Sequence, residues 1–281
     1  MTRDTFKIEG PALISFSGGR TSAYMLRRVL DAHGGTLPAD VHVAFANTGK
    51  EREETLVFVD ACAKAFGVRV TWLEMPWREP DTRGFAVTDF EHAARNGEPL
   101  TALFRKRNFL PNPVMRMCTQ ETKIRPMGKF MRSHGYEEWT NVVGIRADEP
   151  SRVHRIRNAK QRERWENVLP LATAGITQRD VLAFWSAQPF DLGLRSWEGN
   201  CDMCFLKGWD KLVRIARERP DLVQWWADAE AEAGQPFRKE RPAYRDLLKV
   251  VDEPTLPGVF DDNHGAIIDC MCSEDSEAAN D

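Results

Sequence analysis

The feature that most constrains this chain is a loop of hydroxyl and glycine residues between a short apolar run and a helical pattern. The loop spans residues 15–22 and reads SFSGGRTS. The apolar run of residues 12–14 before it is typical of a buried parallel strand. Residues 23–30 after it place apolar side chains at helical spacing. The sequence therefore predicts a strand, a glycine-containing loop and a helix, in that order.

The composition of this loop predicts an anion site. Gly18 and Gly19 let the backbone approach a ligand closely, and Thr21 and Ser22 are residue types that cap helices. The first N–H groups of a helix have no partner within it and carry partial positive charge, so they bind phosphate or sulfate. The alternative is an ordinary strand-to-helix turn, in which the same residues only close the loop.

Strand and helix patterns alternate after this loop. Residues 41–45 and 68–73 are predicted to be strands, and residues 51–66 between them carry apolar side chains near helical spacing. Such alternation is typical of a doubly wound, mostly parallel α/β sheet, in which ligands bind beyond the carboxyl ends of the strands. The first loop and residues 47–49 both lie at such ends.

The rest of the chain is predicted to add one strand, at residues 139–145, and a series of helices. The helices are expected around residues 90–96, 101–106 and 178–187, the last of these capped by Thr177, and between residues 207 and 251. A chain of 281 residues is long enough for one sizeable domain with an appendage. We therefore expect an α/β domain over residues 1–200, a helical cysteine-bearing region over residues 201–272 and a disordered acidic tail over residues 273–281.

A cluster of basic residues follows the strand predicted at residues 139–145. Gly144 at its end allows a ligand to approach the backbone, and Arg146 and Arg152 beyond it are placed to bind a phosphate or sulfate. The basic residues farther along are predicted to lie on the surface; they are Arg155, Arg157, Lys160, Arg162 and Arg164. Two alternatives remain for this basic cluster. All of it is a charged surface loop, or its arginines bind an anionic substrate that extends to nucleic acid.

The six cysteines point to metal or redox chemistry. The chain has no leader-like apolar segment and no apolar membrane span, which predicts a cytoplasmic protein, and cytoplasmic thiols are kept reduced. Cys201 and Cys204 form a C-x-x-C pair that brings two thiolates to one metal, and Cys118 is a third candidate ligand. The tail offers Cys270 and Cys272, while the remaining cysteine lies in mid-helix and is expected to be structural. Four thiolates suit both zinc and a four-iron, four-sulfur cluster.

Four segments of the chain match the motifs of one family in the correct order. SGGRTS at residues 17–22 is similar to SGG-x-D-S, with Thr in the place of Asp, and NTG at residues 47–49 with the following ET is similar to (D/N)TG…ET. CTQETKIRP at residues 118–126 is similar to C-T-x-x-x-K-I-x-P, and GIRADEPSR at residues 144–152 is similar to G-I-R-x-x-E-S-x-R. With these motifs the chain resembles the phosphoadenosine phosphosulfate (PAPS) reductase family of the PP-loop, or adenine nucleotide alpha hydrolase-like, superfamily, and within it the iron-sulfur branch.

The resemblance implies an enzyme that binds ATP or adenylyl sulfate as its adenine nucleotide. The residues implied to bind phosphate or sulfate are Ser17, Gly18, Gly19, Arg20, Thr21 and Ser22, and those implied to contact the adenosine are Asn47, Thr48 and Gly49. Gly144 is implied to lie against the nucleotide, and Arg146 and Arg152 are implied to hold its anionic end and to stabilise charge in catalysis. The iron-sulfur branch implies a 4Fe-4S cluster on Cys118, Cys201, Cys204 and Cys272, with Cys270 as the competing fourth ligand and zinc as the alternative metal.

Three functions are compatible with these motifs. The first is sulfur transfer or reduction of an adenylyl sulfate, which needs a nucleophilic thiol such as Cys270 and a reductant protein as partner. The second is ATP-dependent adenylation and thiolation of a nucleic acid. The third is a non-catalytic module that binds a nucleotide or nucleic acid and contains a structural zinc.

Overall fold

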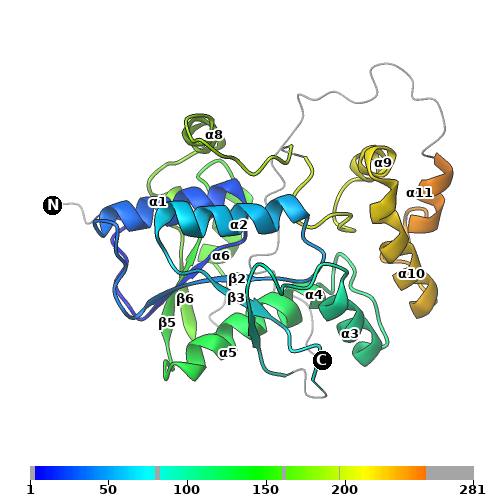
Figure 1. Cartoon of the computed structure of the whole chain (residues 1–281), viewed down its shortest axis with the longest axis horizontal. Coiled ribbons are helices and arrows are strands. Elements are labelled where there is room, and N and C mark those ends of the chain that lie inside the picture. Colours follow the sequence, from blue (N-terminus) through cyan, green and yellow to red (C-terminus); the bar gives the residue numbers. More distant parts are fainter. Residues whose placement is uncertain (1–3, 80–82, 160–162, 196, 251–281) are drawn as a thin grey trace.

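A computed structural model describes residues 4–79, 83–159, 163–195 and 197–250 of the chain (Figure 1). Its centre is a six-stranded sheet with the strand order β4-β3-β2-β1-β5-β6. The strands are β1 (Ala12–Ser15), β2 (Val41–Ala46), β3 (Thr71–Glu74), β4 (Ala86–Thr88), β5 (Trp139–Val143) and β6 (Trp165–Val168). Neighbouring strands pair in parallel except β3 and β4, which are antiparallel. The predicted doubly wound, mostly parallel α/β fold is confirmed.

The two faces of the sheet bury different residues because successive strand side chains point in opposite directions. Ile14, Val43 and Phe45 pack into the larger core, whereas Leu13 and Ala44 pack on the other face. The helices that cover the first face are α1 (Arg20–Ala32), α2 (Glu53–Phe66) and α8 (Gln178–Ser186), and α5 (Arg125–Ser133) covers the second (Figure 1). The sheet is therefore covered by helices on both faces, and its carboxyl edge is left for a ligand.

Local sequence signals place the ends of two of these helices as predicted. Helix α2 ends at Gly67, which adopts the left-handed conformation with φ of 63°. Helix α8 begins with a capping box, in which the N–H of Thr177 donates to the carboxylate of Asp180 at 2.8 Å.

The segment at residues 90–96 is not the helix that we predicted. The N–H of Ala94 donates to the buried carboxylate of Glu74 at 2.7 Å, and the carbonyl of Ala94 accepts from the side chain of Asn47 at 2.9 Å. These tertiary hydrogen bonds use backbone groups that a helix would pair internally, so the segment forms turns instead. The other helix expected in this region is present as α3 (Glu98–Arg107).

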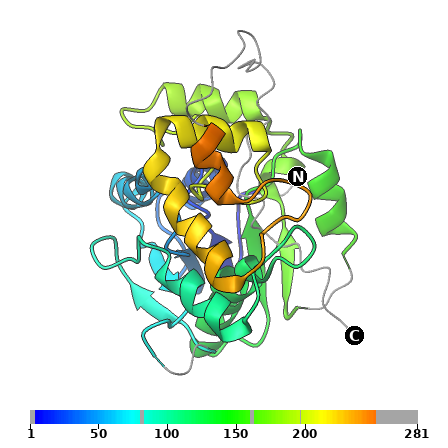
Figure 2. The ribbon, with the colours of Figure 1, turned by 90° about the vertical axis from the view of Figure 1, so that its right-hand side faces the viewer.

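The carboxyl-terminal helices form a second core together with α3 (Figure 2). They are α9 (Trp209–Glu218), the short 3₁₀ segment η2 (Pro220–Leu222), α10 (Val223–Ala233) and α11 (Tyr244–Val250). Trp226, Phe237 and Tyr244 pack against one another at its centre, with ring centroids 5.1 to 5.7 Å apart. The predicted helical region is thus joined to the sheet domain through a packed interface that includes α3.

Shorter helices connect these parts, and some predicted features lie outside the described residues. The connecting helices are α4 (Met117–Thr119), the π-helical segment η1 (Gln120–Ile124), α6 (Pro150–Arg157) and α7 (Pro170–Thr173). The acidic tail and both tail cysteines, Cys270 and Cys272, fall outside the described residues. Within the described part of the chain, we find no helix with the length and apolar content needed to cross a bilayer.

Candidate functional site

The loop between β1 and α1 folds as a cradle with two serines facing each other. The hydroxyl oxygens of Ser17 and Ser22 lie 2.9 Å apart, and Ser22 also donates to the carbonyl of Gly19 at 3.0 Å. Gly18 has φ of +79°, and a Cβ there would lie 2.7 Å from the Thr55 side chain. The loop therefore needs glycine at residue 18 for both its backbone conformation and its packing against α2.

Arg20 and Thr21, the first two residues of α1, have structural partners. The guanidinium group of Arg20 pairs with Asp191, with Nε to Oδ1 at 2.7 Å, and donates to the carbonyl of Leu194 at 2.8 Å. The hydroxyl of Thr21 accepts from Arg146 at 3.0 Å. Neither Thr21 nor Ser22 caps the helix, because the N-cap position is Gly19 and no side chain bonds there. Thr21 instead joins α1 to the loop after β5.

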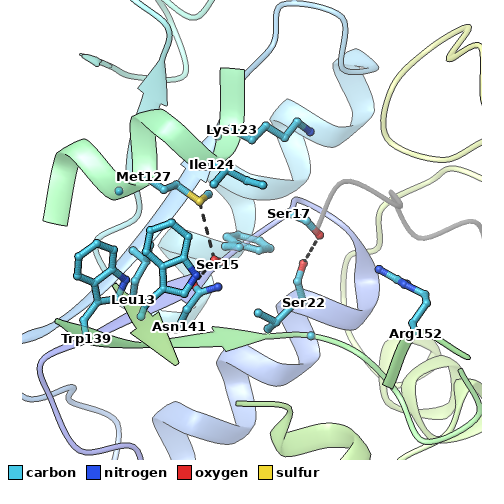
Figure 3. Close-up of a pocket in the computed structure, with 16 residues that line it drawn as sticks. Leu13, Ser15, Ser17, Ser22, Lys123, Ile124, Met127, Trp139, Asn141 and Arg152 are labelled. Carbon is cyan, nitrogen blue, oxygen red and sulfur yellow. Dashed lines mark hydrogen bonds between the residues drawn. The ribbon is translucent and has the colours of Figure 1, made fainter. Parts of the chain in front are cut away.

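A cavity of about 70 Å³ opens beside the cradle, and its polar end gathers hydroxyl and cationic groups (Figure 3). Ser17 and Ser22 lie at this end, with Arg152 opposite them and Lys123 above them in the view of Figure 3. Gly144 lines the same end, and a Cβ at that residue would come within 3.0 Å of the Cα of Ser22. The strand-end glycine thus allows β5 to lie close against the start of α1, while the predicted approach of a ligand to its backbone stays a prediction.

The other end of this cavity is aromatic and apolar. Leu13, Met127, Trp139 and Trp165 line it, and the two indole rings stack with centroids 5.0 Å apart at an angle of 27°. Figure 3 shows Trp139 beside Leu13, on the side of the cavity away from the serines. Asn141 is the polar group at this end. One continuous cavity therefore joins an end lined by hydroxyl and cationic groups to an aromatic end.

The two arginines predicted to hold an anion have different positions. Arg146 is buried, with its side chain bonded to Asp148 at 2.9 Å and to Thr21. Arg152, on α6, lines the cavity and forms an ion pair with Glu149. Glu149 also accepts from the backbone N–H of Arg146 at 3.0 Å. Arg146 therefore positions the loops around the cavity, whereas Arg152 is the one that reaches it.

The loop after β2 is saturated with internal hydrogen bonds. Asn47 is fully buried, donating to Glu74 at 2.7 Å and accepting from the N–H of Gly49 at 3.1 Å. Both the N–H and the hydroxyl of Thr48 donate to Glu51 at 2.8 Å. The predicted adenosine contacts of residues 47–49 stay a prediction, and any such contact would come from the backbone because the Asn47 and Thr48 side chains are already paired.

Three of the predicted metal ligands converge on a second, smaller cavity. Cys118, Cys201 and Cys204 all line a space of about 30 Å³, together with Lys123. The carboxylate of Glu51 lies 3.2 Å from the Lys123 ammonium group and 3.9 Å from the sulfur of Cys201. Cys62 is buried in the main core, as predicted for a structural cysteine. Fold topology therefore brings together thiols that are far apart in the sequence.

The electrostatics around these thiols combine desolvation with nearby cations. Burial raises the pKa of Cys118 to about 11 and also raises the pKa of Cys201, although Lys123 opposes the shift in both. Burial lowers the pKa of Lys207, whose ammonium group bonds the carbonyl of Cys201. Among the described residues, no three His, Cys, Asp or Glu side chains are grouped closely enough to hold a metal ion. The donor chemistry suits a metal-sulfur centre, and the tail cysteines lie outside the described residues.

The C-x-x-C segment is held in place by the loop after β2. The backbone of Asn200 accepts from the N–H of Arg52 at 2.7 Å, and the N–H of Asp202 donates to the carbonyl of Lys50 at 2.9 Å. Lys50 and Asp202 also form a buried ion pair at 2.6 Å. The side chain of Asn200 donates to the carbonyl of Ser17 at 2.7 Å. The cysteine segment therefore touches both strand-end loops.

Lys123 is the functional residue to which sequence reasoning assigned no role. It lines both cavities and lies on the π-helical segment η1, a kind of helix distortion that is frequent at functional sites. The sequence signal that could have identified Lys123 is its position as the lysine of the motif C-T-x-x-x-K-I-x-P at residues 118–126. The local spacing does not reveal that its ammonium group stands between the serine cradle and the thiols.

Comparisons with known proteins cover most of the chain. A family model described as "Phosphoadenosine phosphosulfate reductase domain" matches residues 11–190. The chain is 32% identical over 216 residues to "Uncharacterized nin region protein ORF290" of Escherichia phage lambda. The aligned region covers 75% of this chain and 71% of the phage protein. The chain is also 25% identical over 230 residues to "Uncharacterized protein MJ0066" of Methanocaldococcus jannaschii. This alignment covers 78% of the chain and 41% of the archaeal protein.

Proposed function

The chain belongs to the phosphoadenosine phosphosulfate reductase domain family, and we propose that it is an enzyme that binds an adenine nucleotide, ATP or adenylyl sulfate, at the loop of residues 17–22. The observation that carries this proposal is the polar end of the larger cavity. This small space is lined by two facing serines beside the start of α1, by Lys123 and by Arg152. Such a combination of helix N–H groups, hydroxyls and cations is what phosphate or sulfate binding requires.

In this proposal the residues of the chain bind the anion and stabilise charge. The N–H groups at the start of α1 and the hydroxyls of Ser17 and Ser22 hold the phosphate chain. Lys123 and Arg152 neutralise the negative charge that develops on the leaving group. Arg146 keeps the loops in place through its bonds to Thr21 and Asp148.

We further propose that Cys118, Cys201 and Cys204 hold a metal-sulfur centre, with Cys272 or Cys270 as the fourth ligand and zinc as the alternative metal. Convergence of three thiols on one cavity supports this proposal. The buried cations Lys123 and Lys207 beside them would compensate the negative charge of the thiolates. When bound, an iron-sulfur centre would supply electrons or sulfur for sulfur transfer or reduction.

A second candidate function is adenylation and thiolation of a nucleic acid, and the surface of α6 favours it. Arg152, His154, Arg155 and Arg157 lie on this helix, whose residues include no acidic one. Its residues are exposed or half-buried, and Arg152 reaches the cavity. A basic helix beside the mouth of a nucleotide pocket provides an electrostatic path for a polyanion.

The nucleotide site is tested by titration calorimetry of ATP and adenylyl sulfate against Arg152→Ala. We expect the better-bound nucleotide to lose at least tenfold in affinity, because a charge-assisted hydrogen bond contributes about 1.5–3 kcal/mol. The matched control is Arg155→Ala on the same helix, which does not line the cavity and is expected to change the Kd less than twofold. Equal affinity in Arg152→Ala and the wild type, or no binding of either nucleotide, would contradict the proposal.

The same pair of variants separates the two candidate functions. If the substrate is a nucleic acid, Arg155→Ala weakens the binding of tRNA or duplex DNA and lowers its salt dependence, while nucleotide affinity is unchanged. If the substrate is an adenylyl sulfate, the affinity for tRNA and for duplex DNA does not exceed the affinity for heparin, a non-specific polyanion.

The metal-sulfur centre is tested by metal analysis and absorbance spectra of protein purified without oxygen. We expect Cys201→Ala to lose at least half of the bound iron or zinc, because one of the converging thiolates is removed. Cys62→Ala is the matched control, since Cys62 is buried in the main core, and it should keep the full metal content. Identical metal content in both variants and the wild type would exclude these thiols as ligands.

A further inference from the structure

A third cavity lies at the amino edge of the sheet, opposite the edge that carries the serine cradle. Its volume is about 410 Å³, which is within the range of about 300–1,000 Å³ that is typical of small-molecule sites. Its walls come from the segment between α1 and β2, from residues 67–71 at the start of β3 and from the end of α5. It shares no lining residue with the larger cavity or with the thiol cavity.

The apolar part of the lining is large enough to hold an apolar group. Leu30, Val43 and Phe130 are buried in the protein core, and they line the cavity together with Leu37 and Val68. Apolar surface of this kind is stabilised when a ligand removes it from water. The lining therefore favours a ligand with a hydrocarbon or aromatic body over a sugar or an inorganic ion.

The polar part of the lining is basic. His42, Arg69 and His134 line the cavity, and none of the described residues that line it is acidic. Arg69 is exposed and pairs with no carboxylate among the described residues. The Nδ1–H of His134 donates to the carbonyl of Phe130 at 2.9 Å, so its Nε2 is the nitrogen that takes up a proton. These groups together favour an anion.

The two imidazoles are coupled to each other and to their charged neighbours. Their ring centroids lie 4.6 Å apart, and Nε2 of His42 lies 3.4 Å from the hydroxyl of Tyr136. Burial lowers the pKa of His42, and His134 and Arg69 lower it further, whereas Asp40 opposes these shifts. An anion beside the pair would offset the repulsion among the positive charges, so its binding would favour protonation of His42.

We propose that this cavity is a second ligand site, which binds a small organic anion whose carboxylate lies among Arg69, His42 and His134 and whose apolar body contacts the apolar lining. The inference goes beyond the proposed nucleotide function and does not depend on it, because the two cavities share no residue. The carboxylate accepts charge-assisted hydrogen bonds from the guanidinium group and from the protonated imidazoles.

The test is an NMR titration of the full chain with benzoate, and with benzamide as a neutral probe of the same shape. We expect benzoate to shift the ring signals of His42 and His134 to saturation, with a Kd on the order of 1 mM. Benzamide is expected to bind about fivefold more weakly or not at all, because it lacks the charge. Benzoate that binds no better than benzamide, or that leaves these ring signals unchanged, overturns the inference.

The contribution of the guanidinium group is tested by Arg69→Ala, a substitution of an exposed side chain that should leave the fold intact. We expect the affinity for benzoate to fall about fivefold, since an exposed ion pair contributes up to about 1 kcal/mol. The matched control is Arg78→Ala, because Arg78 is also exposed but does not line the cavity. Equal affinity in Arg69→Ala and the wild type would overturn the inference.

The contribution of the imidazoles is tested by repeating the titration at pH 6 and pH 8, between which benzoate stays fully ionised. We expect the wild type to bind benzoate more tightly at pH 6, and this gain to be smaller in His42→Gln. His92→Gln is the matched control, since His92 is an exposed histidine outside the cavity, and it should keep the wild-type gain. An affinity in the wild type that is the same at both pH values contradicts the assignment of the carboxylate to the two histidines.

Discussion

The loops after β1 and β2 leave neighbouring strands at the same edge of the sheet, yet they have opposite roles. In the first loop, the Ser17 and Ser22 hydroxyls bond to each other, Ser22 also bonds to the carbonyl of Gly19, and both serines line the larger cavity. In the second, the side chains of Asn47 and Thr48 are buried and fully engaged with Glu74 and Glu51. The first loop leaves its hydroxyl groups facing a cavity, whereas the second uses its side chains to hold the protein together.

The difference lies in what covers each loop. The second loop is covered by the C-x-x-C segment, which pairs with it through backbone hydrogen bonds, an isolated β-bridge between Glu51 and Cys201 and the buried pair of Lys50 and Asp202. The first loop meets this segment through the side chain of Asn200, which donates to the carbonyl of Ser17 at 2.7 Å. Two loops at the same edge of the sheet therefore differ in exposure because a different amount of the cysteine segment packs on each.

The largest effect is expected from Asp202→Ala, which removes the main ionic contact between the second loop and the cysteine segment. Lys50 would remain as an unpaired buried charge, which costs about 3–5 kcal/mol. The bond from Trp226 to Asp202, at 2.8 Å, would also be lost. We expect the free energy of unfolding in urea to fall by that amount and amide exchange in α9–α11 to accelerate.

The control for this variant is Asp221→Ala. Asp221 also pairs with a cation, Arg219, but both side chains are about half exposed, at 59% and 46%. A surface ion pair contributes about 0–1 kcal/mol, so little change is expected. If Asp202→Ala were as stable as Asp221→Ala, the second loop would not anchor the cysteine segment and the comparison of the two loops would fail.

A smaller loss of stability is expected from Asn47→Ala, which sharpens the comparison within the second loop. The substitution removes one of the donors to the buried Glu74 carboxylate and the donor to the carbonyl of Ala94, which together cost about 2–3 kcal/mol. Denaturation in urea measures this loss. The Kd for ATP, measured on the folded variant, should change less than threefold because the side chain does not line the nucleotide cavity.

The matched control is Asn96→Ala, since Asn96 is exposed and its amide only reaches Glu98 at 3.4 Å. We expect it to leave both stability and affinity unchanged. The opposite pattern for Asn47→Ala, with wild-type stability and a nucleotide affinity reduced tenfold or more, would show that the second loop contacts the ligand through its side chain.

Local patterns predicted those parts of the fold whose physics is local. The strand before the first loop, α1, α2 with its terminal Gly67 and the capping box at Thr177 follow from apolar spacing and from residues that start or stop helices. The edge strands β4 and β6 were not predicted, because they are only three and four residues long and depend on pairing with a neighbour. The turns at residues 90–96 replaced a predicted helix because Glu74 and Asn47, distant in sequence, bind the backbone of Ala94.

The residues of the candidate site also divide into those that the sequence identified and those whose roles appear only in the structure. Motifs in the sequence identified the serine cradle, Arg152 and the three converging cysteines as residues with chemistry. They did not indicate that Arg146 would be used to hold Thr21, that Lys123 would stand between two cavities, or that Trp139 would face one of them with an unpaired N–H group.

The sequence by itself determined the α/β fold, the family and the loop at residues 17–22, because strand and helix periods, glycine at a positive φ and short motifs are properties of neighbouring residues. Only the tertiary structure decided which strand-end loop faces the larger cavity and which is covered by the cysteine segment. That outcome depends on a segment near residue 200 packing against residues near 50, and such a long-range contact leaves no trace in the spacing of either segment. The loop at residues 17–22 is thus a candidate ligand site because the rest of the fold leaves a cavity beside it.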